Sequence, residues 1–321
     1  LKTVPLVGYS DKLSGRPGDR INFMVSSEHK EDFIAELFRS ISADPNPQGL
    51  GIVEQSCDEF FPKKSFLSRK QAFHPGSYAI SEKSLKITAE DKIIFSVIIY
   101  PTLQCANSQS IIEFGQFCLN LNTEGKVVFV SDAGSVKSSN SVSLRRWQRV
   151  EAQITKLGQI SISLGSLDGS DTLEPTLKQL NRKLDLSQNA LVVIAGQLNG
   201  DAIINCFNGK IEQPEIYVGS NSLASWNFSR NMSSMTVPGS GCPNLKLINA
   251  PTRAVAGALW DASEMNWQHK PEHYASIAFH EDDIYDFNWD PDFSFIIPPN
   301  MPSGIYIMRI SCGDDYDAMP F

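Results

Sequence analysis

The chain has 321 residues, of which 41% are hydrophobic and 20% charged, and its formal net charge is −8. This length predicts about two domains and allows a sizeable core without disulfides or metal ions. The acidic balance disfavours a nucleic-acid-binding protein, which needs a basic face to neutralise phosphates, and no run of about 18 apolar residues predicts a membrane span.

The first part of the chain predicts short strands joined by turns. Arg16–Asp19 has Pro and Gly at the central positions of a type II turn. It leads into Ile21–Val25, where alternate apolar residues share one face of a strand. Glu31–Arg39 could form two helical turns, because Phe33 and Leu37 are spaced i, i+4, but a strand over Phe33–Ile41 fits as well. We favour the strand.

The middle of the chain has a dense succession of predicted strands. Ile93–Ile99 is more continuously apolar than the other segments, which predicts a central strand buried on both faces. Arg149–Thr155 and Ile160–Leu164 alternate apolar and polar residues, as strands of an antiparallel sheet covered on one side do. Thr123–Gly125 predicts a hairpin turn. No Gly-rich phosphate loop follows a strand, which disfavours the common kinds of nucleotide binding.

This pattern predicts an all-β fold of sandwiches or jelly rolls, with strands about every ten residues. The two ends of the chain carry short strands, such as Phe293–Ile297, and Pro-rich joints, and neither end is long enough to form a sandwich alone. We therefore predict that residues 1–52 and 248–321 together form one discontinuous Ig-like β-sandwich. Residues 53–247 would form a second domain inserted into it.

The six cysteines form no C-x-x-C pair, and their sparse spacing predicts free, mostly buried thiols in a reducing compartment. A cytoplasmic location follows from this as an expectation. A nucleophilic Cys57 would need a cationic neighbour such as His74, and we disfavour it. His29, Asp44 and Ser56 are too scattered along the sequence to suggest a catalytic triad.

The stretch FHEDDIYD, residues 279–286, combines one histidine with four carboxylates. Asp286–Asp290 resembles the start of a calcium loop, but Pro291 replaces the required glycine and Ile297 stands where the bidentate glutamate belongs. A looser Ca²⁺ site is an alternative. We favour a strand end and turn whose carboxylates cap backbone N–H groups. The residues of the alternative site would be Asp282, Asp283, Asp286 and Asp290.

Aromatic residues near this stretch are typical of interfaces. We predict that this surface packs against another domain or subunit, with His280, Tyr285, Trp289 and Trp260 as the contact residues. A further cluster favours a core or interface role over sugar stacking; it consists of Trp260, Trp267, His269, His273 and Tyr274. We expect no catalytic and no metal-ligating residue in this chain.

Segments at both ends of the chain resemble the large subunit of N,N-dimethylformamidase, and they occur in the order of that family. The N-terminal segments are Val7–Ser14, Arg16–Ser26 and Ile41–Pro47. The C-terminal segments are Arg253–Gly257, Trp260–Asp261, Pro271–Tyr274, Phe279–Asp286 and Pro302–Tyr306.

The middle of the chain resembles a different module, the concanavalin-A-like or laminin-G-like jelly roll. The motifs are short, and their order and spacing carry the resemblance. They are Trp147–Val150, Phe207–Ile211 and Ser225–Phe228. The resemblance implies that the inserted domain is such a jelly roll.

The dimethylformamidase resemblance implies a longer protein, whose catalytic domain would begin near Phe321 and hold an iron ion with two tyrosines and a glutamate. No residue here is carried over as an iron ligand, so this chain would need no cofactor of its own. It would be the non-catalytic β region of an amidohydrolase that converts a small formamide to amine and formate. Its partners would be the catalytic domain and a small subunit, in an oligomer.

Two other functions are alternatives to an amidohydrolase region. The alternative is a carbohydrate-binding, lectin-like module, since jelly rolls often serve this role although fold does not imply function. A glycoside hydrolase is disfavoured because the middle segment lacks closely spaced acidic residues: Glu113, Glu151, Glu212 and Glu215 stand apart.

Overall fold

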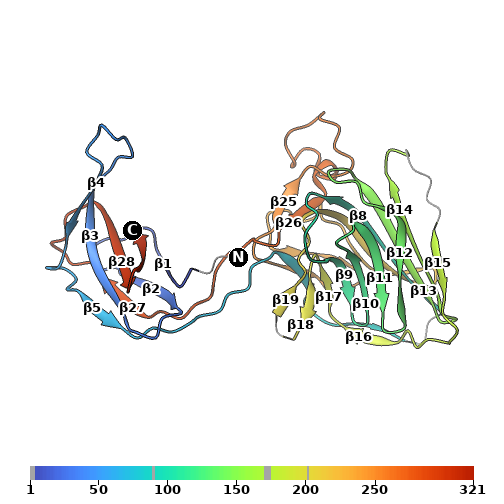
Figure 1. Ribbon diagram of the computed structural model, residues 1–321. Helices are drawn as coiled ribbons and strands as arrows, with labels where there is room; N and C mark the ends of the chain where they lie inside the picture. The colour runs from blue at the N-terminus through green and yellow to red at the C-terminus, as the bar shows by residue number, and fades with distance from the viewer. Residues whose placement is uncertain (1–3, 89–90, 170–174, 201) are drawn as a thin grey trace. The chain divides into compact units, whose positions relative to one another are not determined.

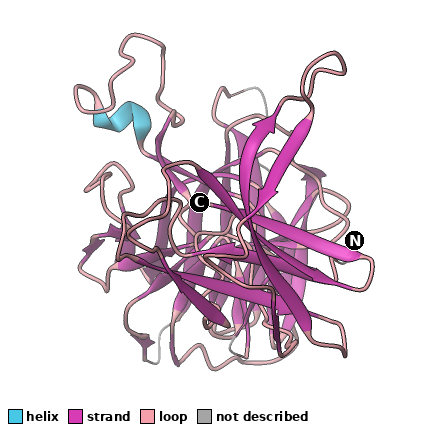
Figure 2. Cartoon of the chain, turned by 90° about the vertical axis from the view of Figure 1, so that its left-hand side faces the viewer, coloured by secondary structure: helices cyan, strands magenta, loops and turns pink. Residues whose placement is uncertain are grey.

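The structure is a computed structural model that describes residues 4–88, 91–169, 175–200 and 202–321. Strands dominate it, and the one helix among the described residues is the short 3₁₀ helix η1 (Pro271–Tyr274), cyan in Figure 2. The chain divides into two compact units (Figure 1). The smaller unit comprises Leu1–Phe73 and Phe287–Phe321, and the larger comprises His74–Asp286.

The smaller unit contains two antiparallel sheets, each built from both ends of the chain. The three-stranded sheet has the order β1 (Leu6–Ser10), β2 (Arg20–Ser27), β27 (Phe293–Ile296). The five-stranded sheet has the order β29 (Asp315–Pro320), β28 (Ile305–Cys312), β3 (Phe33–Ala43), β4 (Ile52–Ser56), with β5 (Lys64–Phe66) also pairing with β3.

The core of the smaller unit is rich in phenylalanine. Phe293 of β27 stacks on Phe66 with ring centroids 4.4 Å apart and on Phe23 at 5.0 Å. Burying each such side chain stabilises the fold by about 1.5–3 kcal/mol. Alternate residues of β2, from Ile21 to Val25, point into this core, which confirms the predicted strand. Phe33–Ile41 lies within β3, so the strand is confirmed over the helix.

A buried carboxylate links the two ends of the chain within the smaller unit. Asp292 accepts hydrogen bonds from Nε of Arg69 at 2.6 Å and from the backbone N–H of Val25 at 2.7 Å. The amide of Gln71 donates a third at 3.1 Å. The Asp292 side chain is only 6% exposed, so these partners compensate for removing its charge from water.

The larger unit is a sandwich of two main antiparallel sheets. The eight-stranded sheet has the order β12 (Gly134–Ser141), β11 (Lys126–Ser131), β10 (Phe117–Leu121), β9 (Gln109–Phe114), β17 (Val192–Ile194), β6 (Tyr78–Ser81), β24 (Leu245–Ile248), β22 (Thr236–Val237). The second sheet runs β15 (Thr176–Gln179), β14 (Gln159–Ser166), β13 (Gln148–Thr155), β8 (Lys92–Pro101), β20 (Gly209–Val218), β21 (Asn221–Trp226), β23 (Gly239–Ser240).

Short strands complete the larger unit. β26 (Ser276–Phe279) pairs with β20 and with β25 (Thr252–Val255), which brings the second sheet to nine strands. Two small hairpin-like sheets join β16 (Gln188–Ala190) to β7 (Leu85–Ile87) and β18 (Gln197–Asn199) to β19 (Ala202–Ile204).

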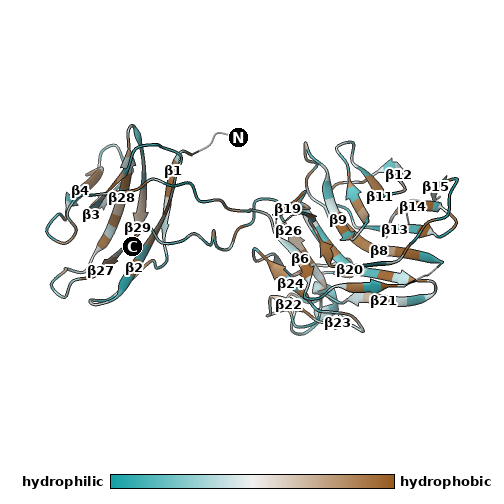
Figure 3. Cartoon of the chain, turned by 90° about the horizontal axis from the view of Figure 1, so that it is seen from below, coloured by the Kyte–Doolittle hydropathy of each residue, from teal (hydrophilic) through white to brown (hydrophobic). Residues whose placement is uncertain are grey.

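The predicted strands of the middle segment are confirmed. β8 lies centrally between β13 and β20, and the alternate residues Val150, Ala152 and Ile154 of β13 are buried in the core between the sheets. Figure 3 shows this alternation of hydrophobic and hydrophilic residues along the strands. The hairpin around Thr123–Gly125 is confirmed by the pairing of β10 with β11.

The predicted domain boundaries are wrong. Residues 53–73 belong to the smaller unit, because β4 and β5 hydrogen-bond to β3. Residues 248–286 belong to the larger unit, because β25 and β26 extend the sheet that contains β20. The observed divisions therefore fall at Phe73–His74 and at Asp286–Phe287.

All six cysteines are free thiols, of which Cys57, Cys118, Cys206 and Cys312 are buried. Among the described residues no helix has the length and apolarity needed to cross a membrane.

Candidate functional site

The acidic stretch closes the larger unit at the point where the chain enters and leaves it. β26 ends at Phe279, and the following residues pair with Gly76 and Ser77. Gly76 donates its N–H to the carbonyl of Asp283 at 2.8 Å, and Ser77 donates to the carbonyl of His280 at 2.9 Å. The carboxylate of Asp283 accepts from the Ser77 hydroxyl at 2.7 Å and lies 3.3 Å from Nδ1 of His280. A strand end and turn, as predicted, explains these residues.

The four aspartates of the alternative Ca²⁺ site lie in different parts of the fold. Asp282, Asp283 and Asp286 belong to the larger unit, whereas Asp290 belongs to the smaller one and has an 88% exposed side chain. Among the described residues, three side chains hold donor atoms close enough together to share a metal ion, and none of these four aspartates is among them. The Ca²⁺ site stays a prediction.

The predicted interface residues differ in accessibility. Tyr285 is 81% exposed and Trp260 is 40% exposed, so both can contact another molecule. Trp289 is 7% exposed, because its ring packs against Tyr9 and Phe287 and its indole N–H donates to the Ala72 carbonyl at 2.9 Å. Trp289 is therefore a packing residue of the smaller unit, which contradicts its prediction as an interface residue.

The aromatic and imidazole cluster lies on the long loop between β25 and β26, which carries η1 (Figure 2). The loop is braced internally: Tyr274 donates to the carbonyl of Glu264 at 2.7 Å, and His273 lies 3.3 Å from Asp261. Hydrogen bonds from Ser263, followed by the charges of His273 and Lys270, lower the pKa of Asp261 to about 2. These contacts explain the loop as a self-supporting structural element.

Beside this loop, charged side chains cover the outer face of the nine-stranded sheet. The ammonium group of Lys210 lies 5.2 Å from the ring centre of Tyr100 and 5.8 Å from that of Trp147, and donates to the carbonyl of Ala256. Burial lowers the pKa of Lys210. Glu212, 1% exposed, accepts the N–H of Ala258 at 2.8 Å, and burial raises the pKa of its carboxyl.

A polar hollow lies further along the same outer face. It is lined by Lys92, Ile94, Ser96, Arg149, Glu151, Glu215, Tyr217, Gly219 and Ser220. Arg149 donates to the hydroxyl of Ser96 at 3.2 Å, and Tyr217 donates to Glu215 at 2.9 Å. The bond to Glu215 and then burial raise the pKa of Tyr217. This hollow offers charged and hydroxyl groups to a polar ligand.

A cluster that sequence reasoning missed lies in the smaller unit. One donor atom each of His29, Glu31 and Cys312 lies within 4.8 Å of the other two. The sequence suggests His29 only as a member of a catalytic triad, since nothing in it connects His29 to Cys312. The feature that brings the two residues together is the antiparallel pairing of β3 with β28, which sets Ile34 opposite Ser311. The start of β3 therefore lies beside the end of β28.

The fold defines an all-β protein of two units built from antiparallel sheets. Residues 252–321 match the family model described as "N,N-dimethylformamidase beta subunit-like, C-terminal". The whole chain is 27% identical over 375 residues to the N,N-dimethylformamidase beta subunit of Paracoccus aminophilus. It is likewise 27% identical over 378 residues to that of Alcaligenes sp. The chain is therefore similar to dimethylformamidase beta subunits.

The chain spans about half the length of these curated relatives, since the similarity covers 100% of the chain and 49% of each relative. Among solved structures, a SAP-like pentraxin from Limulus polyphemus matches with a TM-score of 0.34 and 13% identity, over 59% of this chain and 76% of the pentraxin. Domains LG4-5 of the mouse laminin alpha1 chain match with a TM-score of 0.29 and 9% identity, over 70% and 92%.

Proposed function

We propose that these 321 residues are the non-catalytic β region of a dimethylformamidase-like amidohydrolase. The full enzyme would hydrolyse a small formamide to an amine and formate. The observation that carries this proposal is the similarity to two dimethylformamidase beta subunits over the whole chain but only 49% of each relative. The smaller unit would be a discontinuous Ig-like sandwich and the larger an inserted laminin-G-like jelly roll.

In this proposal the chain acts as a scaffold and interface in a cytoplasmic oligomer. Its partners are a catalytic domain in the same polypeptide and a small subunit; the relatives are themselves named beta subunits. Tyr285 and Trp260 are exposed aromatic side chains, which interfaces favour. They are the residues through which we propose that the larger unit contacts these partners.

The iron that the family resemblance implies does not fit the polar hollow, which is where the described residues place a tyrosine beside a glutamate. Tyr217 bonded to Glu215 is a tyrosine–glutamate pair in a hollow. The other residues that line this hollow include no second tyrosine, and Arg149 adds a positive charge there. We therefore assign the iron, and the hydrolysis, to a part of the enzyme outside these residues.

The test compares two proteins, the 321-residue chain and the product of the complete open reading frame that contains it. Both are supplied with ferrous iron, and release of dimethylamine from N,N-dimethylformamide is measured. We expect turnover with the longer product and none with the 321-residue chain. Hydrolysis by the shorter chain, or a reading frame that stops at Phe321, would refute the proposal.

The alternative function is binding of a carbohydrate, and the polar hollow on the nine-stranded sheet is the observation that favours it. Hydroxyls and charged groups such as Ser96, Glu151 and Tyr217 could hydrogen-bond a sugar there. Calorimetry against simple sugars, with and without Ca²⁺, tests this function. Binding that disappears in Arg149→Ala would support it, whereas no heat with any sugar would exclude it for those sugars.

A further inference from the structure

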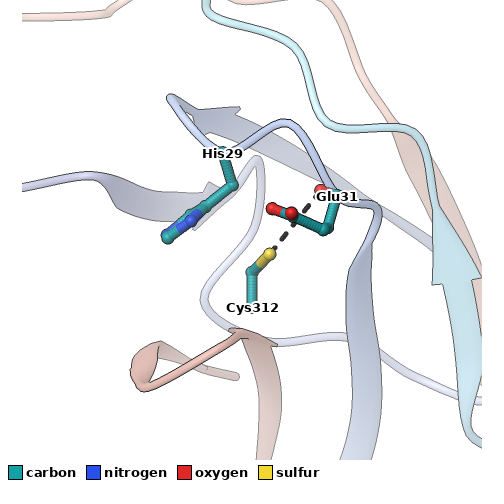
Figure 4. Close-up of side chains that lie close together, drawn as sticks. All are labelled: His29, Glu31 and Cys312. Carbon is teal, nitrogen blue, oxygen red and sulfur yellow. Dashed lines mark hydrogen bonds between the residues drawn. The ribbon is translucent and has the colours of Figure 1, made fainter.

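A loop and a hairpin of the smaller unit bring together three side chains that can ligate a metal ion, and a fourth, Asp315, lies beside one of them. His29 and Glu31 lie on the loop between β2 and β3, Cys312 ends β28, and Asp315 begins β29. In Figure 4 the carboxylate of Glu31 points toward the His29 ring, and the sulfur of Cys312 lies close to both. One donor atom of each of these three residues lies within 4.8 Å of the others.

One ring nitrogen of the His29 imidazole makes no hydrogen bond within the part of the chain that the structure describes. Its Nε2 atom is buried and finds no hydrogen-bond partner among the described residues. A carboxylate oxygen of Asp315 lies 3.0 Å from Nε2, but the pair does not have the geometry of a hydrogen bond. Since a buried polar atom usually has a partner, Nε2 is available to a ligand that both groups can share.

The thiol of Cys312 is also weakly used. Cys312 is 6% exposed, and its sulfur makes only long contacts, 3.5 Å to the carbonyl of Glu31 and 3.8 Å to that of Asp32. A bound divalent cation would attract a thiolate at this position and offset the negative charge of the nearby carboxylates.

We propose that His29, Glu31, Cys312 and Asp315 form a zinc-binding site. Imidazole, thiolate and carboxylate are the ligand types that Zn²⁺ takes in tetrahedral sites, whereas Ca²⁺ and Mg²⁺ prefer oxygen ligands alone. Zinc–ligand bonds of about 2.0–2.3 Å set neighbouring donor atoms about 3.3–3.8 Å apart. The donor atoms, which lie within 4.8 Å of one another, must therefore move closer together. The loop of Glu28–Asp32 can make this movement because it is mostly exposed and lies between strands.

The site joins residues that are far apart in the sequence but that lie at the ends of two paired strands. β3 and β28 are already paired, with Ile34 opposite Ser311, so the metal would clamp the loop and hairpin at the end of an existing ladder. The ligands come from both chain segments that build the smaller unit. Zinc binding would therefore stabilise this unit specifically.

The experiment measures zinc itself. The untagged 321-residue chain is stripped with a chelator, equilibrated with Zn²⁺ and desalted, and zinc per chain is determined by elemental analysis. We expect about one equivalent. Replacement by Co²⁺ should give a thiolate-to-cobalt charge-transfer absorption, since Cys312 supplies the sulfur ligand. Substoichiometric zinc, or a cobalt complex without that absorption, would overturn the proposal.

Matched variants locate the site. We expect Cys312→Ser and His29→Gln to weaken zinc binding by about 100-fold or more and Glu31→Gln by about 10-fold, the last at an exposed position that leaves the fold intact. Cys57→Ser is the control, because Cys57 is a buried cysteine of the same unit outside the cluster. Unchanged affinity in Glu31→Gln and Cys312→Ser, with circular dichroism unchanged, means that zinc binds elsewhere and the assignment is wrong.

Discussion

Gly209 is a residue of the larger unit at which the backbone leaves no room for a side chain. Its φ is 147°, and an added Cβ would overlap the carbonyl oxygen of Tyr100 on the neighbouring strand. We expect Gly209→Ala to lower the free energy of unfolding of the larger unit by about 2–4 kcal/mol. Gly219→Ala is the control, since Gly219 also has positive φ (62°) but no atom within 4 Å of the added Cβ.

The difference between these two variants is measured by urea denaturation. Gly219→Ala should cost about 1 kcal/mol, the backbone penalty alone. Equal losses in the two variants would mean that the close approach of β8 to β20 does not constrain Gly209.

Glu212 should make stability depend on pH. Burial raises its pKa above the ordinary value of 4.5, so the folded state binds a proton more tightly than the unfolded state does. Its contribution is therefore fully present below pH 4.5 and is lost as pH rises through the raised pKa. We expect Glu212→Gln, which can keep the bond to Ala258, to lose less stability over this pH range than the wild type. Parallel pH profiles of the unfolding free energy would contradict this.

Residue roles were predictable from sequence only where local pattern decides them. The alternation in Ile21–Val25 identified buried side chains correctly, because a strand sets successive residues on opposite faces. Trp289 was misassigned because its burial depends on Tyr9, which lies 280 residues away. The convergence of His29 and Cys312 depends on strand pairing in the same way, and no local pattern encodes it.

At the scale of elements, one arginine holds the segment between β21 and β22 in place. The two terminal nitrogens of Arg253 on β25 donate to four backbone carbonyls, those of Phe228, Arg230, Asn231 and Ser234. Without the arginine these carbonyls lose their charged donor. We expect Arg253→Ala to cost about 2–4 kcal/mol and to increase proteolysis within 227–235.

The matched control is Arg146→Ala. The side chain of Arg146 is 63% exposed and pairs with Asp168, so its removal should change stability by less than about 1 kcal/mol. Limited proteolysis with mapping of the cleavage sites reports on the segment directly. Protection of 227–235 equal to that of the wild type would show that Arg253 is not its anchor.

Element types were easier to predict than element partners. β8 and β13 were evident from their apolar patterns, because burial on one or both faces imposes those patterns. That β26 pairs with β20, and not with strands of the smaller unit, depends on contacts between distant segments. The predicted boundary at residue 248 failed for this reason.

At the scale of the whole molecule, each unit has its own hydrophobic core, so we expect the two to unfold separately. Asp292→Asn removes the charge that pairs with Arg69, and we expect it to destabilise the smaller unit by about 2 kcal/mol. Hydrogen exchange read by mass spectrometry should show faster exchange in β2 and β27 and no change in β8 and β13. Faster exchange in all four strands would indicate a single cooperative molecule.

The two hydrogen bonds that tie Gly76 to Asp283 and Ser77 to His280 bear on the entropy of closing a long loop. For the smaller unit, His74–Asp286 is such a loop, and each doubling of a flexible loop costs about 0.6 kcal/mol. Because the larger unit folds with its two ends held together, it shortens the effective loop. The smaller unit then closes as though its two segments were joined by a short connection. Joining Phe73 to Phe287 by a few glycines and serines should then yield a small domain that still folds. A circular dichroism spectrum without strand signal from that protein would show that the smaller unit needs the larger one in order to fold.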